Sequence, residues 1–213
     1  MRLTHQNHEA NITVSLDQTT LDVYRSKADD YQQMTDTLDH SELTALIEQL
    51  PAGGRVLDAG AGPGHHSRMM QEAGFDVVAL EPVAEFADLI EKAGVNTVRA
   101  GFDWITQSAE FDGIWASFSL LHVSRDDFNK YLQNIRTALK PDGILVLGMK
   151  TGAGESRDSL GRFYCFYTEE ELVTTLESLA FKVISKKSGK AEGLAGTYDP
   201  FIYLSAKAEA HVV

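Results

Sequence analysis

VLDAGAGPG, at residues 56–64, runs from a short apolar segment into three closely spaced glycines. An apolar run that ends in this way predicts a buried parallel strand followed by a tight turn. Glycines let the backbone approach a ligand closely, and the helix that follows presents free amides and the positive end of its dipole. The spacing is GxGxG, whereas a dinucleotide-binding GxGxxG would need a glycine at position 65, which is His65. The segment therefore predicts a nucleotide-binding turn and weakens the case for NAD.

A carboxylate ends the next apolar run along the chain. Glu81 follows residues 77–80 and lies 81 − 60 = 21 positions after Gly60. A carboxylate at the tip of a second strand can accept hydrogen bonds from both hydroxyls of a ribose. The glycine turn and this acidic residue together indicate an adenosine-type ligand.

Strand-like and helix-like patterns alternate after residue 64. Strands are expected at 77–80, 97–100, 111–116 and 144–148, and helices at 65–73, 83–93, 124–139 and 169–180. This alternation predicts an α/β fold with an open sheet and right-handed crossovers. Two strand-like runs near the C-terminus, 181–187 and 201–206, have no helical pattern between them, so we expect them to pair antiparallel through a loop at 188–200.

The N-terminal part differs from the rest of the chain. Apolar residues at helical spacing from 26 to 50, interrupted near 39–41, predict two helices. Nothing between this part and the rest resembles an interdomain linker, so we expect one structural domain with an appended N-terminal segment.

Composition excludes several classes of function. The 213 residues include 19 Lys and Arg against 31 Asp and Glu, a net charge of −12, which argues against binding to a phosphate backbone. No apolar run approaches the roughly 18 residues of a membrane span, and no CxxC or HExxH motif predicts a metal site. The first 14 residues show no readable secretory signal, and Cys165 is the only cysteine, so we expect a cytoplasmic protein. Oligomeric state cannot be read from these features.

Further motifs follow the glycine turn in a fixed order. They are ALEP at 79–82, GFDW at 101–104, FDGIWAS at 111–117, LLHV at 120–123 and ALKPDGIL at 138–145. From about Val23 to the C-terminus, the chain resembles the class I S-adenosylmethionine-dependent methyltransferases, specifically their small-molecule branch. The resemblance implies a Rossmann-like, doubly wound, mostly parallel sheet of about seven strands with a C-terminal antiparallel hairpin. It implies S-adenosylmethionine as cofactor and in-line transfer of its methyl group to a small-molecule acceptor.

The resemblance also implies roles for single residues in cofactor binding. Asp58 would order the glycine turn near the methionine part of the cofactor, and Glu81 would bind the ribose hydroxyls. Residues 1–50 would form a helical lid over the domain at 51–213, with Tyr24 on the acceptor and Tyr31 on the cofactor. The other implied cofactor contacts are close approach at Gly60, Gly62 and Gly64, adenine packing by Pro82 and Phe102, an adenine hydrogen bond to Asp103, and backbone contacts at Ser117.

The acceptor side is predicted less specifically. His122 and Tyr164 are candidate bases for a hydroxyl or amine acceptor, since imidazole titrates near neutral pH, whereas a sulfur, selenium or tellurium acceptor needs no base. Residues 152–162 follow the fifth strand, and we expect a mobile acceptor loop there in which Arg157 and Arg162 bind an anionic group.

Structural interpretations compete with these roles. Asp58 and Glu81 could cap helices, Asp103 could be a plain turn residue, and the loop arginines could be solvated charges. At the level of function, the alternatives are a non-catalytic protein of the same fold that binds S-adenosylmethionine and an NAD-dependent oxidoreductase. The sequence does not identify the acceptor, because a fold does not determine what its variable lid and loops admit.

Overall fold

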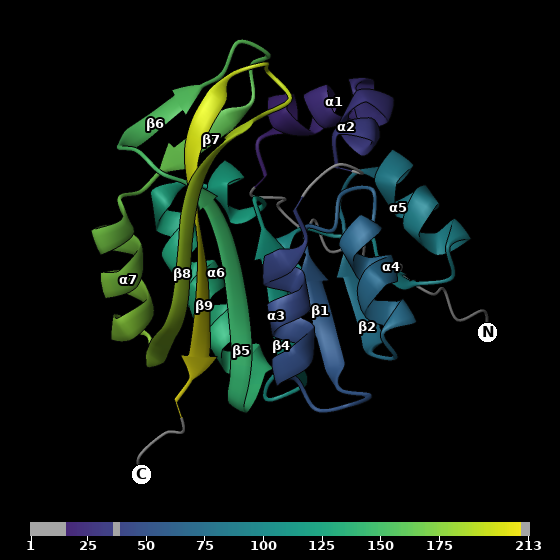
Figure 1. Ribbon diagram of the computed structural model, residues 1–213. Helices are drawn as coiled ribbons and strands as arrows, with labels where there is room; N and C mark the ends of the chain where they lie inside the picture. The colour runs from purple at the N-terminus through teal and green to yellow at the C-terminus, as the bar shows by residue number, and fades with distance from the viewer. Residues whose placement is uncertain (1–15, 36–38, 210–213) are drawn as a thin grey trace, which may run out of the picture.

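A seven-stranded sheet forms the centre of the protein, which is described by a computed structural model over residues 16–35 and 39–209 (Figure 1). The strand order is β3-β2-β1-β4-β5-β9-β8; the first five strands are parallel, and β9 runs antiparallel to both β5 and β8. The prediction of a mostly parallel seven-stranded sheet with a C-terminal hairpin is confirmed. The strands are β1 Arg55–Ala59, β2 Asp76–Leu80, β3 Asn96–Val98, β4 Phe111–Ser117, β5 Leu139–Lys150, β8 Phe181–Glu192 and β9 Tyr198–Ala208.

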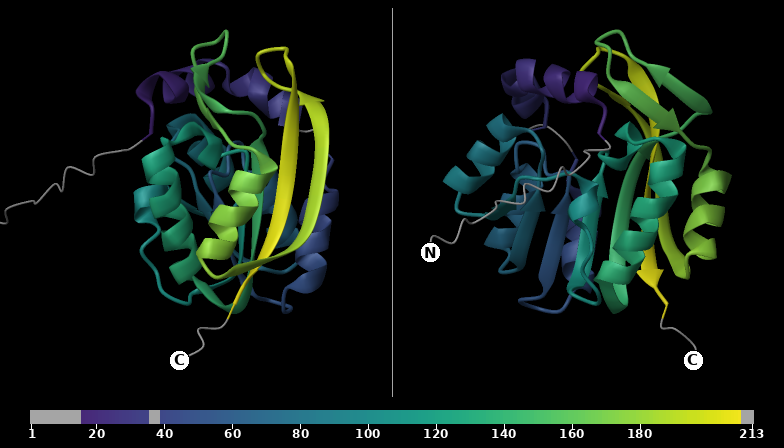
Figure 2. Two further views of the ribbon diagram at one scale, coloured as in Figure 1. Left: turned by 90° about the vertical axis from the view of Figure 1, so that its left-hand side faces the viewer. Right: turned by 180° about the vertical axis from the view of Figure 1, so that it is seen from behind.

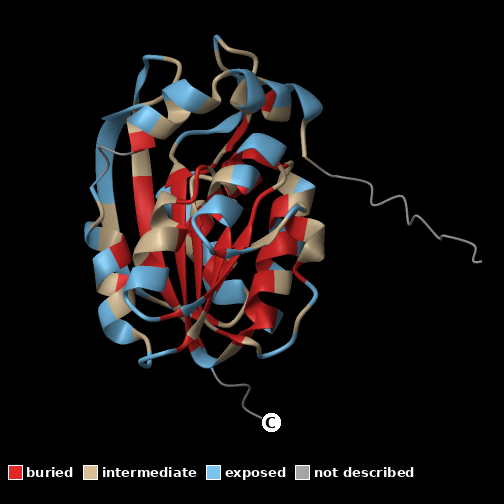
Figure 3. Cartoon of the chain, turned by 90° about the vertical axis from the view of Figure 1, so that its right-hand side faces the viewer, coloured by how far each residue is buried: buried red, intermediate tan, exposed pale blue. Residues whose placement is uncertain are grey.

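Helices cover both faces of the sheet. One buried cluster joins the sheet to α3 (Ser41–Gln49) and α4 (His65–Glu72), and a second joins it to α6 (Arg125–Ala138) and α7 (Glu169–Ser178). Val56 belongs to the first cluster and Leu57 to the second, because successive side chains of a strand point to opposite faces. Figure 2 shows α6 and α7 on the face opposite α3 and α4, and Figure 3 shows the buried residues concentrated on the strands between them.

Two further helices lie across the carboxyl ends of the parallel strands, α1 (Gln18–Ser26) and α2 (Ala28–Thr35) (Figure 1). The sequence indicated two helices between 26 and 50, which correspond to α2 and α3, but it missed α1. Residues 1–15 and 36–38 of the predicted lid lie outside the described residues, and the first of these ranges includes the segment with no readable secretory signal. The remaining elements are α5 (Ala84–Lys92) and the one-turn 3₁₀ helices η1 (Phe102–Trp104) and η2 (Leu120–His122).

The structure corrects the expectation that residues 152–162 form a loop throughout. Residues in it form β6 (Gly154–Arg157), which pairs antiparallel with β7 (Phe163–Phe166) in a separate two-stranded sheet beside α1 (Figure 2). The C-terminal hairpin is also longer than predicted, since β8 and β9 pair as far as Glu192 and Tyr198. Among the helices that the structure describes, none is long and apolar enough to cross a membrane.

Candidate active site

The glycine turn is built where a side chain has no room. Gly60 has φ +83°, and a Cβ placed on it would lie 2.4 Å from Cβ of Ser119. Gly62 has φ +54°, and its Cβ would lie 3.3 Å from a ring carbon of Tyr31 on α2. Left-handed backbone and close neighbours together explain why glycine stands at both positions. The turn therefore lies beside α2 and beside the segment that follows β4.

Glu81 ties this turn to the end of β2. Its side chain is buried, and its two oxygens accept hydrogen bonds from the backbone N–H of Gly62 at 2.7 Å and of Val83 at 2.8 Å. Burial raises the pKa of Glu81 to about 8, although the two amide hydrogen bonds act in the opposite direction. A carboxylate has about four lone-pair positions, so two remain for a ligand in the adjacent cavity.

Asp58 is placed on the other side of the turn. It is buried and accepts a hydrogen bond from the Ser67 hydroxyl on α4 at 2.6 Å. Burial raises the pKa of Asp58 to about 7, and the hydrogen bonds from Ser67 lower it. Asp58 therefore fixes the helix that follows the turn, and it is not among the residues that line the cavity.

A cavity lies between the turn, the end of β2, the lid and the segment after β4. It brings together nine of the residues singled out in the sequence: Tyr24, Tyr31, Gly60, Gly62, Glu81, Pro82, Phe102, Ser117 and His122. The sequence missed Phe86 on α5 and Phe118 after β4, which also line it. Both look like ordinary core aromatics in the sequence, and only the packing of α5 and β4 against the lid reveals their position.

Besides Asp58, three predicted site residues are placed elsewhere. Gly64 has φ +80°, and a Cβ placed on it would lie 2.5 Å from a side-chain carbon of Ile90 on α5. Asp103 accepts hydrogen bonds from Lys130 Nζ at 2.6 Å and from the Tyr131 hydroxyl at 3.0 Å, both on α6. Phe102 lines the cavity and its neighbour Asp103 does not, so the adenine contact of Asp103 stays a prediction. Arg157 lines neither this cavity nor the one beside it. It donates to both carboxylate oxygens of Asp17, the N-cap of α1, and so holds the start of that helix.

A chain of hydrogen bonds joins Tyr24 on α1 to His122 on η2 and to β7. Arg162 donates from Nη1 to the Tyr24 hydroxyl at 3.0 Å, and this hydroxyl lies 2.8 Å from Nε2 of His122. Nδ1 of His122 lies 2.6 Å from the carbonyl oxygen of Phe163. A carbonyl can only accept, so Nδ1 carries the proton, and Nε2 accepts from Tyr24. Asp158 completes the chain by accepting from Arg162 at 2.7 Å.

His122 is consequently a neutral imidazole. Burial lowers the pKa of His122 to about 3, while the hydrogen bond to Phe163 acts to raise it. Its ring packs against Tyr164 on β7, with 4.6 Å between centroids, and burial raises the pKa of Tyr164 far above its ordinary value. The Tyr24 hydroxyl therefore already occupies the lone pair on Nε2 of the neutral imidazole.

A second cavity adjoins the first and shares Tyr24, Tyr31, Phe118 and His122 with it. Arg162 and Tyr164 belong to this second cavity, as do residues 191–194 of the β8–β9 hairpin. Tyr24 on α1 and Tyr31 on α2 therefore line both cavities. Within residues 16–35 and 39–209, no group of three or more His, Cys, Asp or Glu side chains is arranged to hold a metal ion.

Comparisons with known proteins agree with this architecture. Glycine/sarcosine N-methyltransferase of Halorhodospira halochloris is 32% identical over 127 residues, which cover 54% of this chain and 47% of that protein. Demethylmenaquinone methyltransferase of Renibacterium salmoninarum is 33% identical over 144 residues, covering 64% of this chain and 55% of that protein. The chain spans about half the length of the curated relatives it matches.

A solved structure covers more of the chain. The 1,6-didemethyltoxoflavin N1-methyltransferase of Burkholderia thailandensis, crystallised with 1,6-didemethyltoxoflavin and S-adenosylhomocysteine, superposes with a TM-score of 0.68 and 26% identity. The match covers 89% of this chain and 88% of that one. A sequence model of the methyltransferase domain matches residues 32–189. Because that match takes in well over half of the 213 residues, the chain belongs to the methyltransferase-domain family.

Proposed function

We propose that this protein binds S-adenosylmethionine in the first cavity and transfers its methyl group to a small-molecule acceptor in the second. The observation that carries the proposal is that the glycine turn and the buried carboxylate of Glu81 line one cavity, under a lid whose tyrosines reach a second space beside it. The relatives named as methyltransferases support the same chemistry. When bound, the cofactor supplies a methyl carbon activated by a positively charged sulfur.

The cavity's own residues fit such a cofactor. The two remaining lone-pair positions on Glu81 match the two hydroxyls of a ribose. Pro82 and Phe102 offer apolar surface for a flat base, and Gly60 and Gly62 leave room for close approach of the backbone. Ser117 also lines the cavity, and its hydroxyl is 2.8 Å from that of Tyr203. We assign cofactor binding to these residues and a supporting role to Asp58 and Gly64.

The protein's main contribution is alignment of the acceptor and exclusion of water, because the electrophile is already activated. We propose that α1 and α2 act as the lid of the 51–213 domain. Arg157 holds α1 through Asp17, and Thr20 adds a second attachment by accepting the backbone N–H of Phe163 at 2.8 Å. A neutral His122 places no positive charge beside the sulfonium site.

Proton removal by His122 or Tyr164 stays a prediction. An acceptor that must lose a proton to His122 has to replace the Tyr24 hydroxyl at Nε2. The substitution His122→Gln tests the role of a base: if His122 is the base, turnover falls strongly while cofactor affinity is retained, and a near-wild-type rate at all pH values would remove that role.

Cys165 is buried and free, which fits our proposal that the protein works in a reducing cytoplasm.

The direct test uses S-adenosylmethionine carrying a deuterated methyl group, incubated with the protein and a metabolite extract. We expect mass spectrometry to show at least one small molecule that gains the labelled methyl only when the protein is present. Cofactor binding without transfer to any species would instead indicate a non-catalytic binding protein, and fluorescence of added NADH that changes on mixing would favour an oxidoreductase.

A further inference from the structure

The second cavity has walls of a definite chemical kind, and the inference drawn from them rests on the proposed function. Two groups of aromatic rings face it. Tyr24, His122 and Tyr164 form one, with centroids 5.5 and 4.6 Å apart. Phe118 and Phe201 form the other, 5.9 Å apart. Tyr31 also lines the cavity and packs on Tyr24 at 4.9 Å between centroids, so a flat molecule bound there has rings of both groups within its surroundings.

The charges on these walls are largely paired. Lys150 and Arg162 are the cations that line the cavity; Lys150 Nζ lies 2.6 Å from Asp199, and Arg162 donates to Asp158. An anionic acceptor would have to displace a carboxylate from one of these pairs. Both cations also lie over the Tyr164 ring, at 4.6 and 5.3 Å from its centroid, so a cationic acceptor at this ring would meet like charges. Glu192 also lines the cavity, but it is exposed on the hairpin, where salt and water screen its charge. The walls therefore favour an uncharged molecule.

Lys150 provides one polar contact within this aromatic space. An ammonium group has three N–H donors, and the structure gives Lys150 one hydrogen-bond acceptor, Asp199. The face of Tyr164 takes up part of the remaining charge by a cation–π contact. The side chain of Lys150 is only 15% exposed, so water does not readily satisfy its remaining N–H donors. A carbonyl oxygen or ring nitrogen at the edge of a bound molecule would accept a hydrogen bond from one of these donors.

We infer that the methyl acceptor is an uncharged, planar aromatic or heteroaromatic compound that packs against these rings and accepts a hydrogen bond from Lys150. Offset or edge-to-face contacts with the rings stabilise such a plane beyond the burial of its area. Lys150 and Phe201 are then specificity-determining residues, because they contact the acceptor and lie outside the cofactor cavity.

Coumarin is a suitable binding probe, because it is planar, uncharged, carries a carbonyl and has no readily methylated group. Three analogues each change one property: octahydrocoumarin is saturated, coumarin-3-carboxylate is anionic, and N-methylquinolinium is cationic. Affinities are measured by calorimetry with the protein saturated in S-adenosylhomocysteine. We expect coumarin to bind at least about tenfold more tightly than each analogue, the scale of one aromatic or charged contact.

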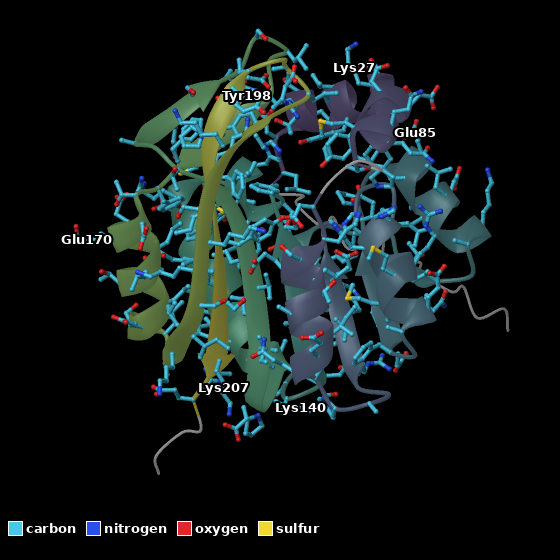
Figure 4. The ribbon with its side chains drawn as sticks, in the orientation of Figure 1. Lys27, Glu85, Lys140, Glu170, Tyr198 and Lys207 are labelled. Carbon is cyan, nitrogen blue, oxygen red and sulfur yellow. The ribbon has the colours of Figure 1, made fainter. Side chains whose placement is uncertain are left out.

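Two lysine variants complete the test. Lys150→Met should weaken coumarin by about tenfold and leave the affinity for S-adenosylhomocysteine unchanged. Lys140→Met is the matched control, since Lys140 lies at the other end of β5 and pairs with Asp112 in the same way (Figure 4); it should change neither affinity. The inference is wrong if coumarin fails to bind the protein loaded with S-adenosylhomocysteine, if any analogue matches it, or if Lys150→Met binds it normally. Failure of S-adenosylhomocysteine itself to bind would instead overturn the proposed function.

Discussion

The Tyr24 hydroxyl joins α1 to two buried residues, and its removal gives a quantitative prediction. In Tyr24→Phe, Arg162 loses a hydrogen-bond acceptor and His122 loses the donor to its Nε2. Both partners are buried, with 2% and 7% of their surface exposed. A neutral hydrogen bond contributes about 0.5–1.5 kcal/mol and one to a charged group about 1.5–3 kcal/mol. Because Tyr24 itself is half-buried, we take the lower part of the sum, about 2–3 kcal/mol.

Hydrogen exchange followed by mass spectrometry measures this loss locally. A destabilisation of this size speeds exchange of the α1 amides, residues 18–26, by roughly 30- to 150-fold, if they exchange through opening of the lid. Tyr198→Phe is the matched control, because Tyr198 is 70% exposed on the hairpin (Figure 4), and it should leave α1 unchanged. Exchange in Tyr24→Phe within threefold of wild type, or an equal effect of the control, would refute the role of this hydroxyl.

Three further predictions concern the cofactor cavity and the lid. Because burial raises the pKa of Glu81 to about 8 and the ionised form accepts the ribose hydroxyls, affinity for S-adenosylhomocysteine should rise with pH up to about 8 and then level off; calorimetry should show no such slope in Glu81→Gln. Gly60→Ala should cost more unfolding free energy than Gly74→Ala, since both glycines have positive φ but nothing lies within 4 Å of a Cβ at Gly74; equal losses in urea would contradict the close packing. The hydrogen bond from Arg157 holds the pKa of Asp17 below its usual range, a contribution that is present above the unfolded pKa and lost as the pH falls. Arg157→Gln should therefore reduce the acid dependence of stability, and an unchanged pH profile would count against the pair.

Local sequence patterns predicted most of the sheet, because each of those elements carries its own signal. The apolar run before the glycine turn became β1, and the absence of a helical pattern near the C-terminus correctly indicated the hairpin. β6 escaped detection because Gly154–Arg157 contains no apolar residue and is exposed throughout, so no alternation marks it. α1 is short and mostly polar, with Thr20 as its only buried residue.

The sequence did not reveal hydrogen-bond partners that lie far away along the chain. The partners of Asp103 are on α6, 27 and 28 residues later, and that of Arg157 is 140 residues earlier. No sequence motif indicates contacts between residues so far apart along the chain. Glu81 was predicted to reach the cavity because its place at the end of a parallel strand determines where it lies. Its hydrogen bond to Gly62 could not be foreseen, since it depends on the shape of the turn.

Equilibrium dialysis of labelled S-adenosylhomocysteine against wild type and Glu81→Ala tests the central claim most directly. Dialysis is done at about pH 9, above the raised pKa of Glu81, so that the carboxylate is ionised. Loss of two hydrogen bonds to this charged carboxylate, about 1.5–3 kcal/mol each, predicts retention by wild type and an affinity lower by roughly two to four orders of magnitude in the variant. Dialysis that leaves wild type without bound ligand, or equal retention by both proteins, would contradict the assignment of this cavity.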